Sequence, residues 1–309
     1  MDRWVVSAVI PSQNRPELRR AIESVLAQSC AEKIEIVLVF DLAPGSVEPP
    51  VDLLRPSDKV LWTAGSQGGS TARNVGVDAA AGEWVAFLDD DDTWSPSKIE
   101  KQLERGRTML DDGLEPVIAC RHQQADVRSG HTSQPVPKVA YDGQQTVAEY
   151  LFAKRRPAGG RASIYTSTLM CRRSLALREP WDPSLARHQD WDWIIRLETS
   201  GGARISQLDE PLVTIYSGSA GSISAGTNWA GSLAWADSVL PAQAPGVYED
   251  FIVAQTLRYA VAARSMSGIR AVVARLRSRR RLPSWGPAII ACAGLIPRKS
   301  LESLMARVR

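Results

Sequence analysis

The sequence predicts an α/β fold in which helices flank a mainly parallel central sheet, followed by a helical C-terminal extension. Two observations lead to this prediction. Short apolar runs, several of them rich in Val and Ile, alternate with segments of helical spacing along residues 4–110, a pattern typical of strand–helix–strand units. Polar side chains follow these apolar runs directly, and in such sheets the carboxyl ends of the strands form the ligand-binding edge.

The first part of the chain gives four strands and three helices. The predicted strands are residues 4–10, 34–40, 59–63 and 83–88. The first helix opens at Pro16 and keeps helical apolar spacing through Gln28. The second helix follows the Gly-rich stretch "GSQGGSTARN" and ends at Gly82. The third begins at Ser95, the expected N-cap, with Pro96 at its first position.

The pattern weakens after Pro116. Residues 116–120, 164–171 and 210–218 are predicted strands, and residues 190–202 are a predicted helix that ends at a glycine pair. Residues 123–160 are polar with scattered Pro and Gly, which favours a long loop region. From Asn228 onward the chain is predicted to be helical.

Composition narrows the class of protein. With 309 residues, 44% of them apolar and 23% charged, the chain is typical of a soluble globular protein. The four cysteines form no CxxC pair, which argues against a zinc site and a disulfide framework and favours a reducing compartment. We expect no signal peptide, and residues 285–297, the longest weakly polar stretch, are too short to span a bilayer.

Charge is distributed unevenly, although the net charge is only +3. From Phe251 onward, twelve Lys and Arg residues stand against one acid, Glu302. Several arginines between Arg264 and Arg281 precede the short Trp-containing apolar stretch "LPSWGPAIIACAGLIP". This combination favours binding to an anionic membrane surface, and no nucleic-acid partner is expected. The alternative is a basic helix face that is only solvated.

The stretch "GEWVAFLDDDDTWSP" ends an apolar strand with four aspartates, Asp89–Asp92. Adjacent like charges repel, so a cation is expected among them. Strand alternation would place Asp89 and Asp91 on one side and the other two aspartates opposite. Hard cations such as Mg²⁺ use one or two carboxylates together with substrate phosphates. The alternative is an acidic turn that caps the next helix, with Asp92 near its positive end.

Four stretches together resemble the family 2 glycosyltransferases. In chain order they are "VSAVIPSQNRPELRRAIESVLAQS", "GGSTARNVGVDAAAGEWVAFLDDDDTWSP", "HQDWDWIIRL" and "DEPLVTIYSGSAGSIS". The resemblance implies the Rossmann-like GT-A fold and sugar transfer with inversion from a nucleotide-diphosphate donor. It implies a transferase domain over residues 1–224, with a nucleotide-sugar-binding half (1–110) and an acceptor-binding half (111–224). Residues 225–309 form the basic, mainly helical extension outside it.

The resemblance also implies a donor site. Asp91 resembles the metal-binding aspartate of the DxD motif, and Asp89 its partner near the ribose, with Mn²⁺ or Mg²⁺ as cofactor. The positions that resemble the nucleotide-binding residues are Pro11, Asn14, Arg15, Asp41, Gly69, Arg73, Asp89 and Asp90. Asp41 resembles the acid that reads uracil, although Phe40 stands where the family usually has a second acid. The alternatives are a helix cap for Asn14 and a surface salt bridge for Arg73.

Asp190, in "QDWDW", resembles the family's catalytic base. A carboxylate in a partly desolvated pocket can take the proton of an acceptor hydroxyl as it attacks. Gln189 replaces the usual Glu, and Ser219 falls where the family often has a histidine near the metal. The alternative is that Asp190 only caps its helix. Trp191 or Trp193 is a candidate for stacking on an acceptor sugar, with a core role equally open.

These expectations describe an enzyme that moves a sugar, from a UDP-sugar above all, to a glycan or lipid-linked acceptor in cell-surface polysaccharide or glycoconjugate synthesis. The expected location is the cytoplasm, peripheral at the inner face of the membrane. The alternative is a catalytically weak or inactive nucleotide-sugar-binding scaffold, which Phe40, Gln189 and Ser219 favour. A nucleotidyltransferase would carry a Gly-rich basic loop after its first strand, where this chain has "PSQNRPE".

Overall fold

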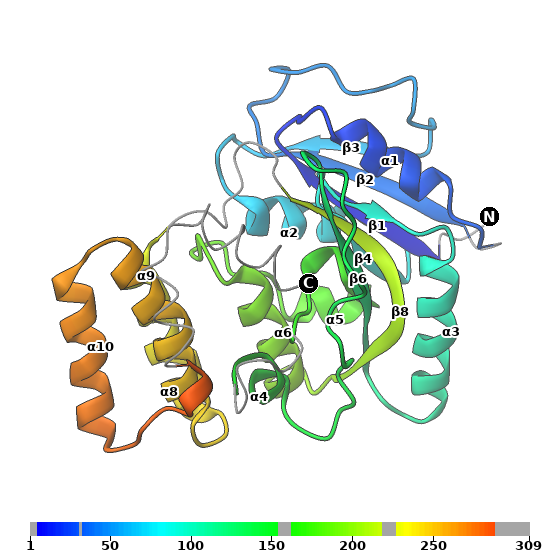
Figure 1. Cartoon of the computed structure of the whole chain (residues 1–309). Helices are drawn as coiled ribbons and strands as arrows, with labels where there is room; N and C mark the ends of the chain where they lie inside the picture. Colours follow the sequence, from blue (N-terminus) through cyan, green and yellow to red (C-terminus); the bar gives the residue numbers. More distant parts are fainter. Residues whose placement is uncertain (1–4, 31–32, 154–161, 218–226, 288–309) are drawn as a thin grey trace. The chain divides into compact units, whose positions relative to one another are not determined.

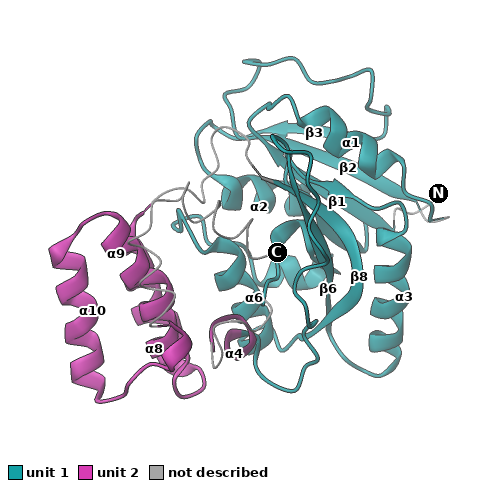
Figure 2. Ribbon diagram, in the orientation of Figure 1, with its two compact units in different colours: residues 1–147, 161–221 teal, residues 148–160, 222–309 magenta. Residues whose placement is uncertain are grey.

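The computed structural model describes residues 5–30, 33–153, 162–217 and 227–287. The chain divides into two compact units, shown in Figure 2. Unit 1 consists of residues 1–147 and 161–221, and unit 2 of residues 148–160 and 222–309. The domains expected from the sequence, 1–224 and 225–309, stay a prediction, and the units differ from them mainly in where residues 148–160 belong.

In the described part of unit 1, eight strands form one sheet in the order β3-β2-β1-β4-β7-β6-β8-β5 (Figure 1). Their bounds are β1 Val6–Ser12, β2 Ile34–Phe40, β3 Lys59–Trp62, β4 Trp84–Phe87, β5 Thr93–Trp94, β6 Pro116–Asp126, β7 Met170–Arg172 and β8 Arg204–Ser217. β1 to β4 pair in parallel, and β6 pairs in parallel with β8. β7 and β5 run antiparallel to their neighbours. The expected mainly parallel α/β sheet is confirmed.

The helices of unit 1 cover both faces of this sheet. Their bounds are α1 Leu18–Leu26, α2 Gly69–Ala79, α3 Lys98–Asp111, α5 Arg173–Arg178 and α6 Gln189–Thr199, while α4 Val147–Phe152 groups with unit 2. β1 and β2 are buried along their whole length, and their side chains alternate between faces. Ile10 and Leu38 share a core with apolar residues of α1 and α3. Val9 faces the other way and lies against Gly76 of α2, where any Cβ would overlap it.

The predicted start of α3 was wrong. α3 begins at Lys98 with Ser97 in the N-cap position, and no side chain bonds the cap. Ser95 instead follows directly after the short strand β5, and its N–H donates to the carbonyl of Leu212 in β8 (2.8 Å). The pairing of Ser95 with a strand distant in sequence overrides its local preference for a helix start.

The strands after Pro116 differ in length from the strands that the sequence pattern predicts. β6 and β8 are longer than predicted, because they pair with each other along most of their length, so polar residues such as Gln123 and Gln124 still belong to β6. The region 123–160, expected to be a loop, therefore includes the end of β6 and all of α4. The predicted strand 164–171 is mostly a 3-10 turn, Thr166–Thr168, that leads into the short β7.

Unit 2 is helical in its described part. Its elements are α7 Trp229–Val239, the 3-10 turn η3 Leu240–Ala242, α8 Val247–Phe251, the π-helical segment η4 Ile252–Leu257, α9 Arg258–Ala262 and α10 Met266–Arg279. Asn228 caps α7 by accepting a hydrogen bond from the N–H of Gly231 (2.9 Å), in agreement with the predicted helical start. Residues 148–160 group with this unit because Phe152 packs against Trp235 and Phe251, with ring centroids 6.0 and 4.9 Å away.

No helix in the described ranges has the length and apolar character needed to cross a bilayer.

Candidate active site

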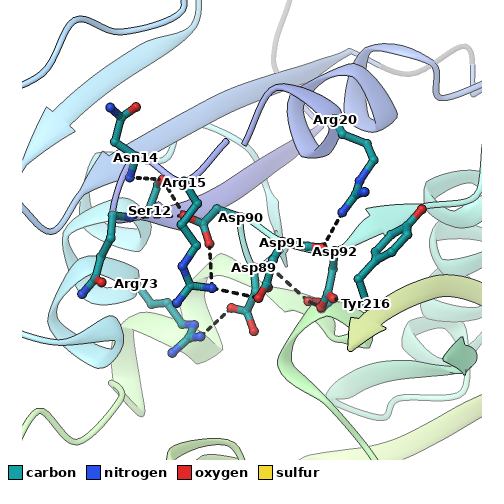
Figure 3. Close-up of polar contacts among 12 residues, drawn as sticks. Ser12, Asn14, Arg15, Arg20, Arg73, Asp89, Asp90, Asp91, Asp92 and Tyr216 are labelled. Atoms are coloured by element: carbon teal, nitrogen blue, oxygen red, sulfur yellow. Dashed lines mark hydrogen bonds and ion pairs between the residues drawn. The ribbon is translucent and has the colours of Figure 1, made fainter. Parts of the chain in front are cut away.

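The polar residues that follow β1 and β4 lie together at the carboxyl edge of the sheet, as Figure 3 shows. The hydroxyl of Ser12, the last residue of β1, donates to Asp90 (2.7 Å). Arg15, three residues later, donates to Asp91 (2.8 Å). The loop after β1 and the acidic run after β4 are therefore joined by side-chain contacts, as expected for neighbouring parallel strands.

The four aspartates form a turn rather than a continuation of β4. β4 ends at Phe87, and the N–H of Asp92 donates to the carbonyl of Asp89 (3.1 Å). The expected grouping holds, with Asp89 and Asp91 more exposed than Asp90 and Asp92, although a turn rather than a strand produces it. The alternative of an acidic turn is right about the backbone, but Asp92 does not cap α3. Its carboxylate is buried and accepts from the Ser167 hydroxyl (2.6 Å) and the N–H of Tyr216 (3.3 Å).

Asp90 and Asp92 are the two inward carboxylates of this turn. Asp90 is 5% exposed and also accepts from the N–H of Gln13 (3.2 Å). Burial raises the pKa of Asp90, and it raises the pKa of Asp92 well above its usual value with a contribution from the charge of Asp89. Their partners come from the protein itself, so both aspartates hold the turn to β1 and to the segment around Ser167.

Asp89 and Asp91 are the two outward carboxylates, and each meets an arginine. Arg73 donates to Asp89 Oδ1 (2.6 Å), and Arg15 donates to Asp91 Oδ2 (2.8 Å) and lies 3.6 Å from Asp90. The side chains of Asp89 and Asp91 are 35% and 20% exposed. Burial and the charge of Asp89 raise the pKa of Asp91 to about 6, although Arg15 opposes this shift. Burial and crowding of the four carboxylates therefore disfavour the ionised form of Asp91, and Arg15 offsets this only in part.

Asp89 and Asp91 each have a carboxylate oxygen that could bind a divalent cation. Within the described residues, no other residue donates a hydrogen bond to Asp89 Oδ2 or Asp91 Oδ1. No group of three or more His, Cys, Asp or Glu side chains in these ranges could hold a metal alone. Two hard carboxylate oxygens completed by substrate phosphates are a donor set that Mg²⁺ or Mn²⁺ accepts. The residues fit the expected cofactor, which would share Asp91 with Arg15.

The start of α2 forms the wall beside the acidic turn. Gly68, with φ of 89°, occupies the N-cap position, and a Cβ on Gly69 would lie 3.0 Å from Arg73 Nη1. The missing side chains let the backbone approach a ligand closely. Asp41 braces this loop, because its buried carboxylate accepts from the Thr63 hydroxyl (2.7 Å) and from two backbone N–H groups. The structure gives Asp41 this bracing contact, and the expected contact with a base stays a prediction.

Arg73 joins the two halves of the site. Its guanidinium reaches Asp89 through Nη2 and Gln189 Oε1 through Nη1 (3.2 Å), and it lies over the ring of Trp181, 4.9 Å from the centroid. Arg73 is 7% exposed, so it is not a surface salt bridge. Asn74, the next residue, exchanges two hydrogen bonds with the backbone of Trp181 (2.8 and 2.9 Å). α2 thereby fixes the segment that leads into α6.

Asp190 is the second residue of α6 and does not cap it. His188 occupies the N-cap position with φ of 65°, and Asp190 Oδ1 accepts from the N–H of Trp191 (2.9 Å). Burial raises the pKa of Asp190 to about 6, and the charge of Asp89 adds to the effect while Arg73 opposes it. Because Asp89 and Arg73 both affect the pKa of Asp190, the acidic turn and the start of α6 share one electrostatic environment.

The neighbours of Asp190 divide into core and candidate contact residues. Trp193 is fully buried and stacks on Trp181 with centroids 4.1 Å apart, so it belongs to the core. Asp192 is also buried and forms an ion pair with Arg196 (2.8 Å). Trp191 is only partly buried and stacks on the His188 ring (4.8 Å between centroids), which leaves it as the candidate for contact with an acceptor.

The remaining predicted positions lie at or beside the same edge. Pro11 is buried inside β1, opposite Val39 of β2. Asn14 is exposed in the left-handed region (φ of 59°), and its N–H donates to Ser12. It does not cap α1, whose N-cap position is Glu17. Ser219 lies outside the described residues.

Sequence reasoning missed three residues that hold the acidic turn. Ser12 and Ser167 bond its inward carboxylates, and Arg20 donates to the carbonyl of Asp91 (3.0 Å) while its guanidinium covers the Tyr216 ring, 3.6 Å from the centroid. A serine directly after a strand, followed by a polar loop, could have drawn attention to Ser12. Ser167 lies 75 residues from its partner Asp92, and no local pattern points to it.

Residues 7–127 match the family model described as Glycosyl transferase family 2. The chain is 27% identical over 241 residues to the Amylovoran biosynthesis glycosyltransferase AmsB of Erwinia amylovora, which covers 76% of this chain and 77% of that relative. It is 32% identical over 104 residues to the UDP-Glc:alpha-D-GlcNAc-diphosphoundecaprenol beta-1,3-glucosyltransferase WfgD of Escherichia coli, covering 33% of this chain and 41% of that relative.

Solved structures show the same fold. S. aureus TarS 1-349 in complex with UDP-GlcNAc matches with a TM-score of 0.59 at 15% identity, over 97% of this chain and 92% of that one. The complex of the same protein with UDP matches with a TM-score of 0.54 at 15% identity, over 99% and 92% of the two chains. The expected GT-A fold is confirmed by these likenesses.

Proposed function

Residues 7–127 belong to glycosyltransferase family 2, and from this premise we propose that the protein is an inverting, metal-dependent sugar transferase. Its donor is a nucleotide-diphosphate sugar, UDP-linked above all, and its acceptor is a glycan or a lipid-linked glycan. Its place is the synthesis of a cell-surface polysaccharide or glycoconjugate. Two names support this choice, since AmsB is an amylovoran biosynthesis enzyme and TarS was solved with UDP-GlcNAc.

One observation carries the proposal. Arg73 contacts Asp89 and Gln189, which are 100 positions apart in the sequence, and Asp190 follows Gln189 directly. In a displacement with inversion, the attacking hydroxyl must approach the sugar carbon from the side opposite to the one from which the diphosphate leaves. The contact with Arg73 brings a candidate diphosphate-binding group and a candidate base to one place, as displacement with inversion requires.

Asp190 is the proposed base. With a pKa of about 6 it is mostly ionised at neutral pH, yet it is a stronger base than an exposed aspartate. It takes the proton of the acceptor hydroxyl as that oxygen attacks the anomeric carbon. Trp191, beside it, is the proposed stacking surface for the acceptor sugar.

The donor diphosphate is the proposed ligand of the acidic turn and of α2. The planar fork of Arg73 suits phosphate oxygens, and Gly68 and Gly69 leave room for them. Asp89 and Asp91 would hold Mn²⁺ or Mg²⁺ through their partnerless oxygens. The bound cation would supply positive charge to the leaving diphosphate. Asn14 and Arg15, on the loop after β1, are the proposed contacts to the ribose and base.

The proposed acceptor and location follow from a relative and from charge. The name of WfgD describes transfer to a diphosphoundecaprenol-linked sugar. An acceptor of that class lies in a membrane, so we place this enzyme in the cytoplasm at the inner membrane surface. The basic residues of unit 2 suit such a surface and are considered further below.

The scaffold alternative rests on Gln189. Arg73 meets a neutral amide at the position where the family usually has a second carboxylate, so the surroundings of Asp190 carry less negative charge. A protein that binds nucleotide sugars without turning them over would keep the donor contacts, while Asp190, though present, would not act as a base beside Gln189. Measuring binding and turnover on the same variants separates the two functions.

The decisive experiment compares Asp190→Asn with Asp192→Asn. UDP release is measured from a panel of UDP-sugars with polyprenyl-diphosphate-linked sugar acceptors, and UDP binding is measured by calorimetry. We expect Asp190→Asn to lower turnover by about 10³-fold, a typical value for losing a general base, with UDP binding unchanged. Asp192→Asn, two residues further on the same helix, should keep its turnover. Nucleotide binding without turnover in the wild type would favour the scaffold function.

A further inference from the structure

The arginines of α10 fall into two sets with different surroundings. Arg275 donates twice to Asp237 Oδ2 (3.0 and 3.1 Å). Arg279 donates to the buried Glu249 (2.8 Å), and its guanidinium covers the Tyr248 ring. These two arginines face the body of unit 2 and are paired, so they hold α10 in place.

Arg270 and Arg277 lie on the opposite side of the same helix. They are seven residues apart, which places them on one face, and both are exposed. Arg280 and Arg281 follow the last helical residue and are exposed too. Within the described residues none of these four has an acidic partner. The sequence contains no acid at all from Phe251 to Pro287, so four positive charges remain uncompensated.

Two large apolar side chains follow Arg280 and Arg281 within five residues of the chain. Leu282 is 87% exposed and Trp285 is 60% exposed, higher fractions than apolar side chains of this size usually show. The segment that carries them is held in place, because the N–H of Ser284 donates to the buried carboxylate of Asp250 (2.6 Å). A basic face that is only solvated would explain the arginines but not a fixed, exposed Leu and Trp.

We infer that this surface docks on an anionic phospholipid bilayer. The docking face consists of Arg270, Arg277, Arg280, Arg281, Leu282 and Trp285. The arginines match the negative surface potential of anionic lipids, and Leu282 and Trp285 enter the headgroup boundary, where Trp is favoured. The choice of a membrane partner rests on the proposed function, since a lipid-linked acceptor requires the enzyme to work at a bilayer. The choice of residues rests only on the structure of unit 2.

The test is flotation of the full-length protein with phosphatidylcholine vesicles, with and without phosphatidylglycerol. We expect the wild type to bind only the anionic vesicles and to be released by high salt. Arg277→Gln combined with Arg281→Gln should lower partitioning about 25-fold, from roughly fivefold per arginine. The matched control removes two exposed charges from unit 1, Arg128→Gln with Lys138→Gln, and should stay within about twofold of the wild type.

Leu282→Ser combined with Trp285→Ser tests the apolar half of the docking face at constant charge. It should lower partitioning onto anionic vesicles by about tenfold, as expected when two apolar side chains no longer enter the interface. Equal loss from the unit 1 control, or no loss in either docking-face variant, would overturn the inference. So would a pattern in which the arginine variant loses binding to a DNA oligonucleotide while vesicle binding is unchanged.

Failure of the proposed function would give a different pattern. Asp190→Asn should float like the wild type, and the Arg277→Gln, Arg281→Gln variant should bind UDP with metal as the wild type does. If no nucleotide binds the wild type but flotation still depends on the docking face, then the membrane surface stands and the transferase proposal fails.

Discussion

Two of the arginine–aspartate pairs in this molecule, Arg275–Asp237 in unit 2 and Arg15–Asp91 in unit 1, are built differently. In unit 2, both oxygens of Asp237 are bonded, to Arg275 and to the Tyr248 hydroxyl (2.6 Å). At the edge of the sheet in unit 1, Arg15 uses one oxygen of Asp91 and leaves the other without a partner in the described residues. The first pair is closed, and the second is open to a further ligand.

Local charge reinforces this difference. Arg15 and Arg73 face a turn of four adjacent carboxylates, and the pKa of Asp91 rises to about 6 because of burial and the charge of Asp89. In unit 2, the hydrogen bond and charge of Asp237 instead raise the pKa of Arg275, as expected for a satisfied pair. An arginine–aspartate contact alone therefore does not distinguish a structural pair from a binding site. What distinguishes the Arg15–Asp91 pair is the carboxylate oxygen that Arg15 leaves free and the crowding of like charges around it.

The largest expected effect separates the open site from the closed pair. Asp91→Asn should weaken UDP binding in the presence of Mn²⁺ by about 100-fold or more, since loss of a ligand should exceed the effect of losing an outer contact. Calorimetry with Mn²⁺ and with EDTA measures this. Asp237→Asn makes the same chemical change in the closed pair and should leave UDP binding unchanged. Equal effects of the two substitutions would remove the distinction.

The pH dependence of turnover should reveal the raised pKa values of the open site. Below pH about 6, we expect turnover at saturating metal to fall about tenfold per pH unit as Asp190 takes up its proton. A raised pKa in the folded state means that these carboxylates contribute less to stability as pH rises from about 4 to about 6. Their protonation therefore does not unfold the protein. Circular dichroism at pH 5.5 should show it folded, and a flat pH profile would contradict the role of Asp190.

Removing Arg15, the arginine of the open pair, should change the affinity of the site for Mn²⁺. Arg15→Gln should tighten binding of Mn²⁺ alone by about fivefold, corresponding to about 1 kcal/mol, because the metal no longer shares Asp91 with a guanidinium. Electron paramagnetic resonance of free Mn²⁺ measures the affinity without nucleotide. Weaker binding in the variant would show that Arg15 supports the site rather than competing for it.

The smallest effect is expected in the closed pair. Arg275→Gln should lower the free energy of unfolding by about 0.5 kcal/mol, since the side chains of this pair are 49% and 32% exposed and water screens such contacts. Denaturant titration measures this change, and UDP binding should be unaffected. A loss of several kcal/mol would mean that the pair does more than fasten α10.

Much of the fold over residues 1–110 could be predicted, because its signals are local. Continuous apolar runs fixed β1, β2 and β4, and each site loop follows its strand within a few residues. Arg73 and Asp190 could be named because four stretches together resemble one family, and in the structure Arg73 bonds Gln189, the neighbour of Asp190. The start of α3 failed because Ser95 bonds to β8, a strand more than a hundred residues later that no local pattern reveals.

The partners of the predicted residues were harder to foresee than the residues themselves. Asp41 is expected to contact a nucleotide base, yet its carboxylate already accepts hydrogen bonds from Thr63 and from two backbone N–H groups of the loop before α2. Arg15 is expected near the ribose, yet its guanidinium donates a hydrogen bond to Asp91. Spacing indicates which side chains gather at an edge, but the hydrogen bonds depend on distances between loops that only the folded chain defines.

The two hydrogen bonds between Asn74 and the backbone of Trp181 have a consequence for protein engineering. Asn74 belongs to the helix that carries Arg73, while Trp181 introduces the segment that carries Asp190. Consider a chimera that joins residues 1–110 of this chain to the part of a relative that matches residues 111–224. Its sequence would have to restore both hydrogen bonds between residue 74 and residue 181. Chimeras that exchange residues 69–79 and 181–190 together should fold more readily than chimeras that exchange only one of these segments. Such paired exchange is a practical route to new acceptor specificity.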